Sequence, residues 1–257
     1  MIRKDGGNME EFYINSDGIR LHAKLQKPEG TDKCPMVIVV HGLTGNMEEE
    51  HIIAAAETFC EMGCAALRVE MYGHGKSEGP FEDHTLFKWV NNILDVVRYA
   101  KTLDYVTDLY LCGHSQGGLL TIMAGGLMPD VFKAIIPMSP AVNIPVAVRK
   151  GNFFGQIIDF NDLKDSFDFF GNTLNADYMR VARMIDTDDY IDKYHKPVLI
   201  IHGDQDEAVP IAYGKACAER YEQGKLAVIK GADHCYVGQV DELRMILHNY
   251  MKEMLKE

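Results

Sequence analysis

The chain has 257 residues, of which 47% are apolar and 25% are charged, a composition typical of a globular protein with a sizeable core. Acidic residues outnumber basic residues by 38 to 26, giving a formal net charge of −12. Because the sequence has no dense run of Lys and Arg, nucleic acids and anionic membrane surfaces are not expected as partners. No segment offers the roughly 18 consecutive apolar residues of a membrane span.

The first residues, MIRKDGGNMEEF, contain no apolar region of a secretory signal, so a cytoplasmic location is expected. Residues 1–10 are interpreted as a mobile leader. The segments Phe12–Ile14 and Ile19–Leu25 flank Asn15-Ser16-Asp17-Gly18, which is a strong turn signal. Together they predict an antiparallel hairpin.

Apolar, β-branched runs then alternate with segments of helical periodicity, which is typical of strands buried on both faces and of the helices that cover them. The predicted strands are Met36–Val40, Cys64–Val69, Asp108–Cys112, Phe132–Met138, Pro197–Ile201 and Leu226–Ile229. The predicted helices are His51–Met62, Thr85–Lys101, Gly117–Leu127, Ile211–Tyr221 and Val240–Lys252. This alternation predicts an α/β fold with a mostly parallel sheet, covered on both faces, in one domain spanning 1–257.

The alternation stops after Ser139-Pro140 and returns only at Pro197. Residues 141–183 are rich in Asn, Asp, Gly and Phe, and they are interpreted as an insertion into the single domain. Insertions of this length are usually functional, so a small lid is expected. If the lid moves, Gly151–Gly155 and Gly171 are candidate hinges.

The cysteines and histidines indicate neither a metal nor a redox site. No C-x-x-C pair, no H-x-x-x-H or H-x-H spacing, no G-x-G-x-x-G opening a helix and no Walker-type loop is present, so no metal or cofactor is expected. The cysteines, expected as buried free thiols, are Cys34, Cys60, Cys64, Cys112, Cys217 and Cys235.

Gly113-His114-Ser115-Gln116-Gly117 lies between a predicted buried strand and a helix that starts at once. This is the context of the G-x-S-x-G nucleophile elbow, in which glycines permit a tight, strained turn that exposes the serine at the carboxyl edge of the sheet. The pattern therefore predicts an α/β-hydrolase fold with Ser115 as its nucleophile.

Serine needs a base to take its proton, and in this fold the chain order is serine, acid, histidine. His202-Gly203-Asp204-Gln205-Asp206 and Gly231-Ala232-Asp233-His234 each follow a predicted strand, so both loops reach the edge that carries Ser115. His234 is the candidate base and Asp206 the candidate acid. Asp204 is the alternative acid, although it more often orders such a turn, and Asp233 is interpreted as a turn residue.

An acyl-transfer site also needs donors for the oxyanion. The backbone N–H groups of Gln116, which follows the nucleophile, and of Leu43, in the loop after the strand Met36–Val40, are the candidates. The remaining histidines near this edge, His41, His74, His114 and His202, are expected to order their loops.

Four segments together resemble bacterial feruloyl (cinnamoyl) esterases, and the similarity runs from about Phe12 to the C-terminus. They are His41–Asn46, Tyr72–Gly79, Gly113–Gly118 and Gly231–Cys235. The resemblance implies the triad Ser115, Asp206 and His234. It also implies hydrolysis of hydroxycinnamate esters of plant cell-wall sugars, with a small lid over an aromatic acyl pocket.

The insertion is rich in aromatic residues, on which a planar phenolic group stacks well. They are Phe153, Phe154, Phe160, Phe167, Phe169, Phe170 and Tyr178. Phe167, Phe169, Phe170 and Tyr178 are the candidate substrate-binding residues; the alternative is that these rings form the lid's own core. Trp89 is expected in the main core.

These features predict two-step acyl transfer from a small-molecule ester to water. A homodimer is one assembly that the chain could form. The same triad would serve a monoacylglycerol lipase or a general short-chain carboxylesterase, and thioester or peptide cleavage is a further alternative. A non-catalytic binding protein is disfavoured because all three triad members are present. The sequence does not fix which hydroxycinnamate or which alcohol is preferred.

Overall fold

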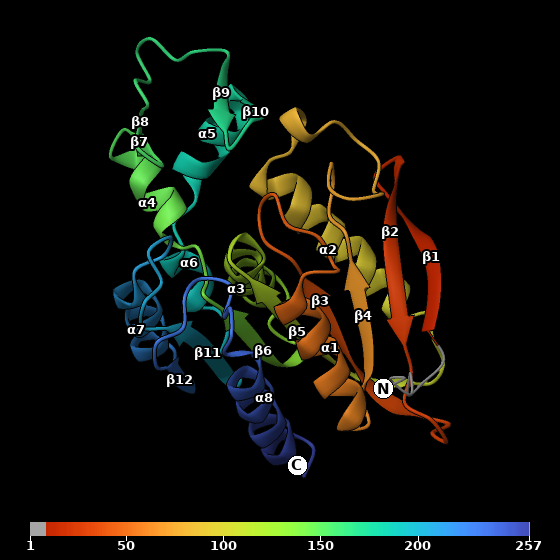
Figure 1. The fold of residues 1–257 in the computed structure, drawn as a ribbon. Coiled ribbons are helices and arrows are strands. Elements are labelled where there is room, and N and C mark those ends of the chain that lie inside the picture. Colours follow the sequence, from red (N-terminus) through yellow and green to blue (C-terminus); the bar gives the residue numbers. More distant parts are fainter. Residues whose placement is uncertain (1–8, 257) are drawn as a thin grey trace.

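The structure, a computed structural model, describes residues 9–256, which are built around an eight-stranded sheet (Figure 1). The strand order is β1-β2-β4-β3-β5-β6-β11-β12, and the strands from β4 to β12 run parallel. The predicted hairpin is present, and it adds two antiparallel strands at one edge. The strands are β1 (Met9–Ser16), β2 (Ile19–Gln26), β3 (Cys34–Val40), β4 (Ala65–Val69), β5 (Val106–His114), β6 (Phe132–Met138), β11 (Val198–Gly203) and β12 (Gly224–Ile229).

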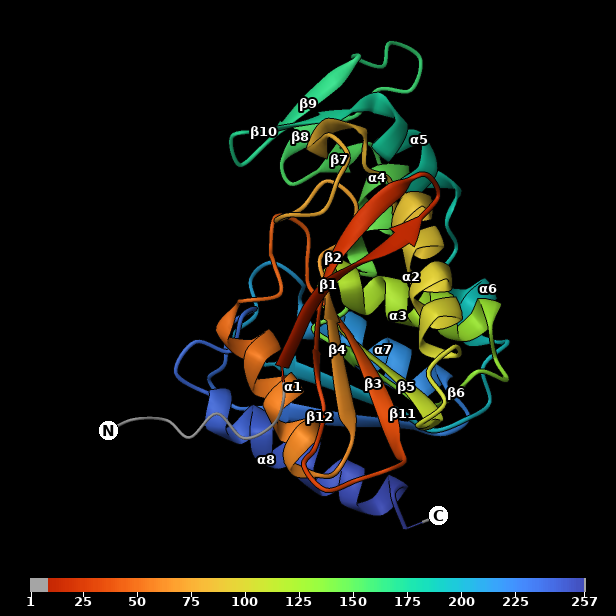
Figure 2. The ribbon, with the colours of Figure 1, turned by 90° about the vertical axis from the view of Figure 1, so that its right-hand side faces the viewer.

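Helices cover both faces of this sheet (Figure 2). α1 (Glu50–Glu61) and α8 (Val240–Met254) pack on one face, whereas α2 (Leu86–Ala100), α3 (Gln116–Leu127) and α7 (Ile211–Arg220) pack on the other. Successive residues of β3 enter opposite cores, because side chains alternate along a strand. This explains why the sequence shows unbroken apolar runs, and it confirms the predicted fold class.

The predicted strands and helices outside the insertion are all present, with ends that differ by a few residues. β5 continues to His114 because His114 still pairs with Met138 of β6. The predicted leader is wrong for Met9 and Glu10, which begin β1 and pair with β2. Its remaining residues, 1–8, lie outside the described residues.

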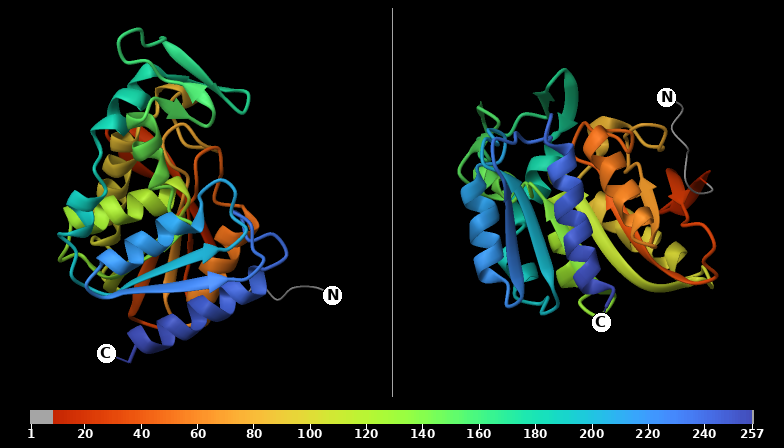
Figure 3. Two further views of the ribbon diagram at one scale, coloured as in Figure 1. Left: turned by 90° about the vertical axis from the view of Figure 1, so that its left-hand side faces the viewer. Right: turned by 60° about the horizontal axis from the view of Figure 1, so that its bottom comes forward.

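The segment between β6 and β11 lies at the carboxyl end of the parallel strands (Figures 2 and 3). It contains no βα unit but has two short hairpins between short helices. The elements are α4 (Asn143–Arg149), β7 (Asn152–Phe153), β8 (Gln156–Ile157), β9 (Ser166–Phe169), β10 (Asn172–Asn175), α5 (Ala176–Met184) and α6 (Asp188–Ile191). Residues 141–183 are called the insertion below.

The two candidate hinge regions contain the turns of these hairpins. Phe154-Gly155 and Phe170-Gly171 each form a two-residue turn, and φ is positive at all four residues, from 47° to 83°. This is the backbone of a type I′ turn. A hinge function for these segments stays a prediction. Within residues 9–256, no helix is both long enough and apolar enough to cross a membrane.

Candidate active site

Ser115 is the single residue between the end of β5 and the start of α3, and its backbone is strained, with φ 55° and ψ −118°. Its flanking glycines are required by space. A Cβ at Gly113 would lie 2.3 Å from the carbonyl oxygen of Gly117, and a Cβ at Gly117 would lie 2.5 Å from the carbonyl oxygen of His41. No other residue fits such close approaches, so the sequence folds here into the sharp elbow that leaves Ser115 partly exposed.

The structure brings the three predicted triad residues together from three separate loops. His234 Nε2 lies 2.9 Å from Ser115 Oγ, and His234 Nδ1 lies 2.8 Å from Asp206 Oδ2. The Asp206 side chain is fully buried, whereas that of His234 is 21% exposed. A nucleophile, a base within hydrogen-bond reach and a carboxylate that orients the base are the arrangement that acyl transfer needs.

Asp206 is held as a carboxylate by its neighbours. Burial would raise the pKa of its carboxyl, but hydrogen bonds from His202 and His234 outweigh burial and lower that pKa below its ordinary value. The backbone N–H groups of Ala208 and Val209 also donate to Oδ1, at 3.0 and 2.8 Å. An ionised Asp206 fixes the Nδ1–H tautomer of His234 and stabilises its imidazolium form.

Asp204, the alternative acid, has a different place. Its Oδ1 accepts a hydrogen bond from the backbone N–H of Gly231 at 2.7 Å, which joins the loop after β11 to the loop after β12. Asp233 accepts from the N–H groups of Cys235 and Val237, as a turn residue does. The geometry therefore supports Asp206, not Asp204, as the partner of His234.

His114 is buried in the elbow and contacts the loop of the candidate base. Its Nε2 lies 2.7 Å from the carbonyl oxygen of His234 and donates to it. Burial first, and the neighbouring histidines second, lower the pKa of His114 far below its ordinary value. The ring is therefore neutral and carries its proton on Nε2, so it ties the His234 loop to the elbow.

The loop after β3 passes directly against the serine. A Cβ at Gly42 would lie 3.0 Å from Ser115 Cβ and 3.5 Å from Ser115 Oγ. His74 Nε2 accepts a hydrogen bond from the Thr44 N–H at 3.1 Å and so orders this loop. Within the described part of the chain, the N–H groups of Leu43 and Gln116 donate to no other residue. Their use as oxyanion donors stays a prediction.

The four candidate substrate-binding residues do not share one environment. Phe167 and Phe169 are buried in the insertion, Tyr178 is fully buried, and Phe170 is 78% exposed at a hairpin turn. The Tyr178 hydroxyl donates to Gln116 Oε1 at 2.7 Å. This contact with the residue after Ser115 has no signal in the sequence, because 62 residues separate its partners.

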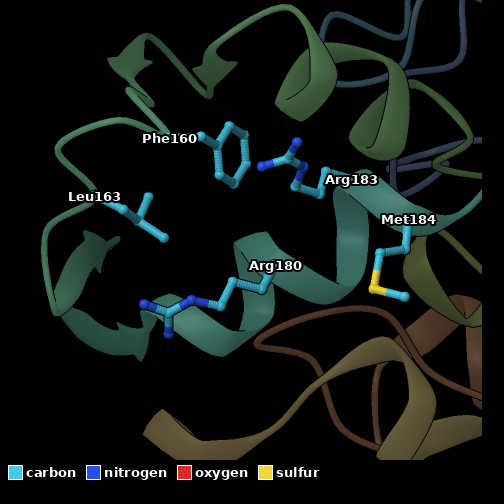
Figure 4. Close-up of a pocket in the computed structure, with 5 residues that line it drawn as sticks. All are labelled: Phe160, Leu163, Arg180, Arg183 and Met184. Atoms are coloured by element: carbon cyan, nitrogen blue, oxygen red, sulfur yellow. The ribbon is translucent and has the colours of Figure 1, made fainter.

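One cavity lies within the insertion and another borders it, and neither is lined by a triad residue. One of about 450 Å³ is lined by Phe160, Leu163, Arg180, Arg183 and Met184 (Figure 4). Figure 4 shows Arg183 extending toward the Phe160 ring, whose centroid lies 4.0 Å from the guanidinium carbon. The other, of about 690 Å³, is bordered by residues of α4, α6 and α7.

Cys235, next to the candidate base, is a free thiol, as are the other five cysteines. Burial raises the pKa of the Cys235 thiol to about 11, so it is protonated and weakly nucleophilic near neutral pH. Among the described residues, no group of His, Cys, Asp or Glu is arranged to hold a metal ion.

The fold and the site together define an α/β-hydrolase. Residues 31–160 match the family described as serine aminopeptidase, S33 (Hydrolase_4), and the chain belongs to this family. A solved structure of Est1E from Butyrivibrio proteoclasticus with ferulic acid bound is 48% identical, with a TM-score of 0.94 over 96% of this chain and all of that chain. A second structure of Est1E is 45% identical, with a TM-score of 0.91. The predicted resemblance to feruloyl esterases is confirmed.

Curated relatives are more distant. Lysophosphatidylserine lipase ABHD12 from Danio rerio is 26% identical over 86% of this chain and 58% of that protein. Monoglyceride lipase from Rattus norvegicus is 29% identical over 50% of this chain and 42% of that protein. The chain thus spans about half the length of these relatives.

Proposed function

We propose that this protein is a serine carboxylesterase that hydrolyses hydroxycinnamate esters, such as feruloyl esters of plant cell-wall sugars. The observation that carries the proposal is the hydrogen-bonded series Ser115–His234–Asp206 in a chain that matches a ferulate-binding esterase fold over nearly its whole length. The insertion adds clustered aromatic rings at the edge of the sheet that carries Ser115.

The proposed reaction has two steps. His234 Nε2 takes the proton of Ser115 Oγ as that oxygen attacks the ester carbonyl, and the backbone N–H groups of Leu43 and Gln116 stabilise the oxyanion. His234 then gives the proton to the alcohol oxygen as the ester C–O bond breaks. The alcohol departs, and the acyl group stays bound to Ser115 Oγ. In the second step water, deprotonated by the same histidine, attacks the acyl-enzyme and releases the acid.

A second candidate is a monoacylglycerol lipase. It is favoured by one observation: the monoacylglycerol lipase of Mycolicibacterium smegmatis is 23% identical over 88% of this chain and 89% of that protein. The two candidates share the triad and differ in the acyl group that they accept, so substrate preference separates them.

The experiment compares kcat/KM for methyl ferulate, p-nitrophenyl butyrate and a monoacylglycerol. A kcat/KM for methyl ferulate equal to or above that for the activated butyrate supports the feruloyl esterase. A strong preference for the aliphatic esters would support the monoacylglycerol lipase instead. Ser115→Ala should remove activity on every ester, whereas Cys235→Ala, the control for the neighbouring thiol, should retain it; the reverse result would exclude Ser115 as nucleophile.

The expected cytoplasmic location and the homodimer belong to the same proposal. Cell fractionation tests the first, and sedimentation equilibrium of the purified protein tests the second.

A further inference from the structure

Tyr178 of α5 forms a buried polar contact between the insertion and the nucleophile elbow. Its ring is fully buried, and its hydroxyl donates to Oε1 of Gln116 at 2.7 Å. Gln116 is also fully buried and is the first residue of α3, immediately after Ser115. A buried hydrogen bond of this kind fixes both partners, because breaking it would leave the amide oxygen of Gln116 without a partner and away from water.

The rings of His84 and Phe153 pack against Tyr178. The ring of His84 lies 5.1 Å from the ring of Tyr178, and the Gln116 amide contacts His84. Burial lowers the pKa of His84 to about 3, so it faces the pair as a neutral ring. Nearby, Asn175 Nδ2 donates to Asp83 Oδ1 at 2.6 Å, which docks β10 on the 3₁₀ helix η1 (Phe81–Asp83).

The peptide between Ser115 and Gln116 needs such support. Ser115 has φ 55°, a conformation that a non-glycine residue keeps only when its surroundings enforce it. The N–H of that same peptide is the expected oxyanion donor, and a donor stabilises the oxyanion only if it is aimed at the position where the charge develops. A side chain that immobilises Gln116 therefore also sets the direction of its N–H group.

We propose that Tyr178 is a positioning residue, whose hydrogen bond to the Gln116 side chain aligns the Gln116 backbone N–H for the oxyanion when the insertion is docked on the elbow. This inference rests on the proposed function. If Tyr178 is a positioning residue, it affects oxyanion stabilisation during hydrolysis of every ester. If it is a substrate-binding residue, as the sequence predicted, it contacts the acyl group and affects only esters that carry that group. The two assignments predict different kinetics.

The test is Tyr178→Phe, which removes the hydroxyl and keeps the ring. The matched control is Tyr194→Phe, because Tyr194 is equally buried and its hydroxyl donates at 3.2 Å to the carbonyl oxygen of Phe132, away from Ser115. For Tyr178→Phe, kcat should fall about tenfold on methyl ferulate and on p-nitrophenyl butyrate alike, with KM nearly unchanged. The expected loss is smaller than the roughly 10²–10³-fold effect of losing a donor entirely.

Two further measurements separate positioning from general loosening. A boronic acid that forms a tetrahedral adduct with Ser115 should bind Tyr178→Phe about tenfold more weakly, whereas inhibition by the product ferulic acid should be unchanged. Gln116→Met, which removes the side-chain partner but keeps the backbone N–H, should lose as much activity as Tyr178→Phe. The double variant should lose no more than either single variant, because both remove the same interaction.

The possible outcomes distinguish failure of this inference from failure of the proposed function. A loss confined to methyl ferulate would make Tyr178 a substrate contact and overturn the inference, as would unchanged kcat or an equal loss in Tyr194→Phe. If Tyr178→Phe does not fold, full activity of Gln116→Met would overturn it. Activity of Ser115→Ala, or an inactive wild-type protein, would instead refute the proposed function.

Discussion

Phe170→Asn should stabilise the protein, although it removes an aromatic ring. Phe170 occupies the first central position of the two-residue turn between β9 and β10, with φ 49°, and Gly171 follows with φ 78°. Asn-Gly is the preferred pair for this turn, because Asn tolerates positive φ better than other residues that have a Cβ. Relief of the backbone strain should contribute about 1 kcal/mol to the free energy of unfolding.

The loss of burial works against this gain and can be judged from the structure. Phe170 is 78% exposed, so only about a fifth of the roughly 1.5–3 kcal/mol for burying a Phe side chain is lost. The net effect should be about 0.3–0.7 kcal/mol of stabilisation, or about 1–3 °C in Tm for a chain of this size. Phe154 has the same backbone strain but is only 43% exposed, so Phe154→Asn loses more burial and should leave stability unchanged or lower.

Urea unfolding of the wild type and both variants, with thermal melts, measures these differences. Equal destabilisation by both substitutions would refute the strain argument. The same proteins test Phe170 as a candidate substrate-binding residue. If its exposed ring contacts the acyl group, Phe170→Asn raises KM for methyl ferulate and leaves KM for p-nitrophenyl butyrate unchanged.

Three further predictions concern the site. Asp206→Asn should lower kcat by about 10⁴, because the amide no longer stabilises the His234 imidazolium, whereas Asp204→Asn should lower it far less; equal losses in ester assays would refute the choice of acid. Since folding lowers the pKa of Asp206, its contribution to stability is present above the unfolded pKa of about 3.9 and is lost as pH falls toward the lower folded pKa. The stability difference between wild type and Asp206→Asn, measured by denaturant unfolding from pH 7 to pH 3, should therefore shrink at the acid end. His114→Phe, which removes the 2.7 Å bond to the His234 carbonyl, should lower kcat about tenfold with KM unchanged, and an unaltered kcat would exclude this support.

The sheet and its helices could be predicted because each buried strand is an unbroken apolar run, and because helical periodicity fills the intervals. The relative positions of Ser115, Asp206 and His234 also followed from this pattern. Each lies in the loop that follows a strand, and parallel strands bring their carboxyl ends to one edge of the sheet. The sequence already favoured Asp206 over Asp204, and the structure adds which neighbour each carboxylate reaches: Asp206 contacts His234, whereas Asp204 accepts from the Gly231 N–H.

The interior of the insertion could not be predicted by the same means. Strands of two to four residues are too short to show periodicity, and Phe-Gly turns lack the Asn-Gly or Asp-Gly signature by which hairpins are found. The aromatic residues of the insertion fit both alternatives left open by the sequence. The Phe153 ring packs on Phe169 and on Tyr178, as in a small core, while Phe170 contacts the edge of this cluster at Phe169 and stays mostly exposed.

The two variable positions of G-x-S-x-G each form a hydrogen bond with a distant segment of this protein. His114, before the serine, donates to the loop of His234, and Gln116, after it, accepts from Tyr178 of the insertion. Each bond spans a long stretch of sequence and ends on a residue adjacent to the strained Ser115. These two bonds anchor the residues on either side of Ser115, and this helps to maintain its strained backbone. His114 and Gln116 therefore connect the nucleophile both to the loop of the base and to the insertion. Variants at either position should therefore lower both kcat and stability, because each leaves a buried polar group without its partner. Substitution of Gly113 or Gly117, whose Cβ would meet backbone, should prevent folding of the elbow itself.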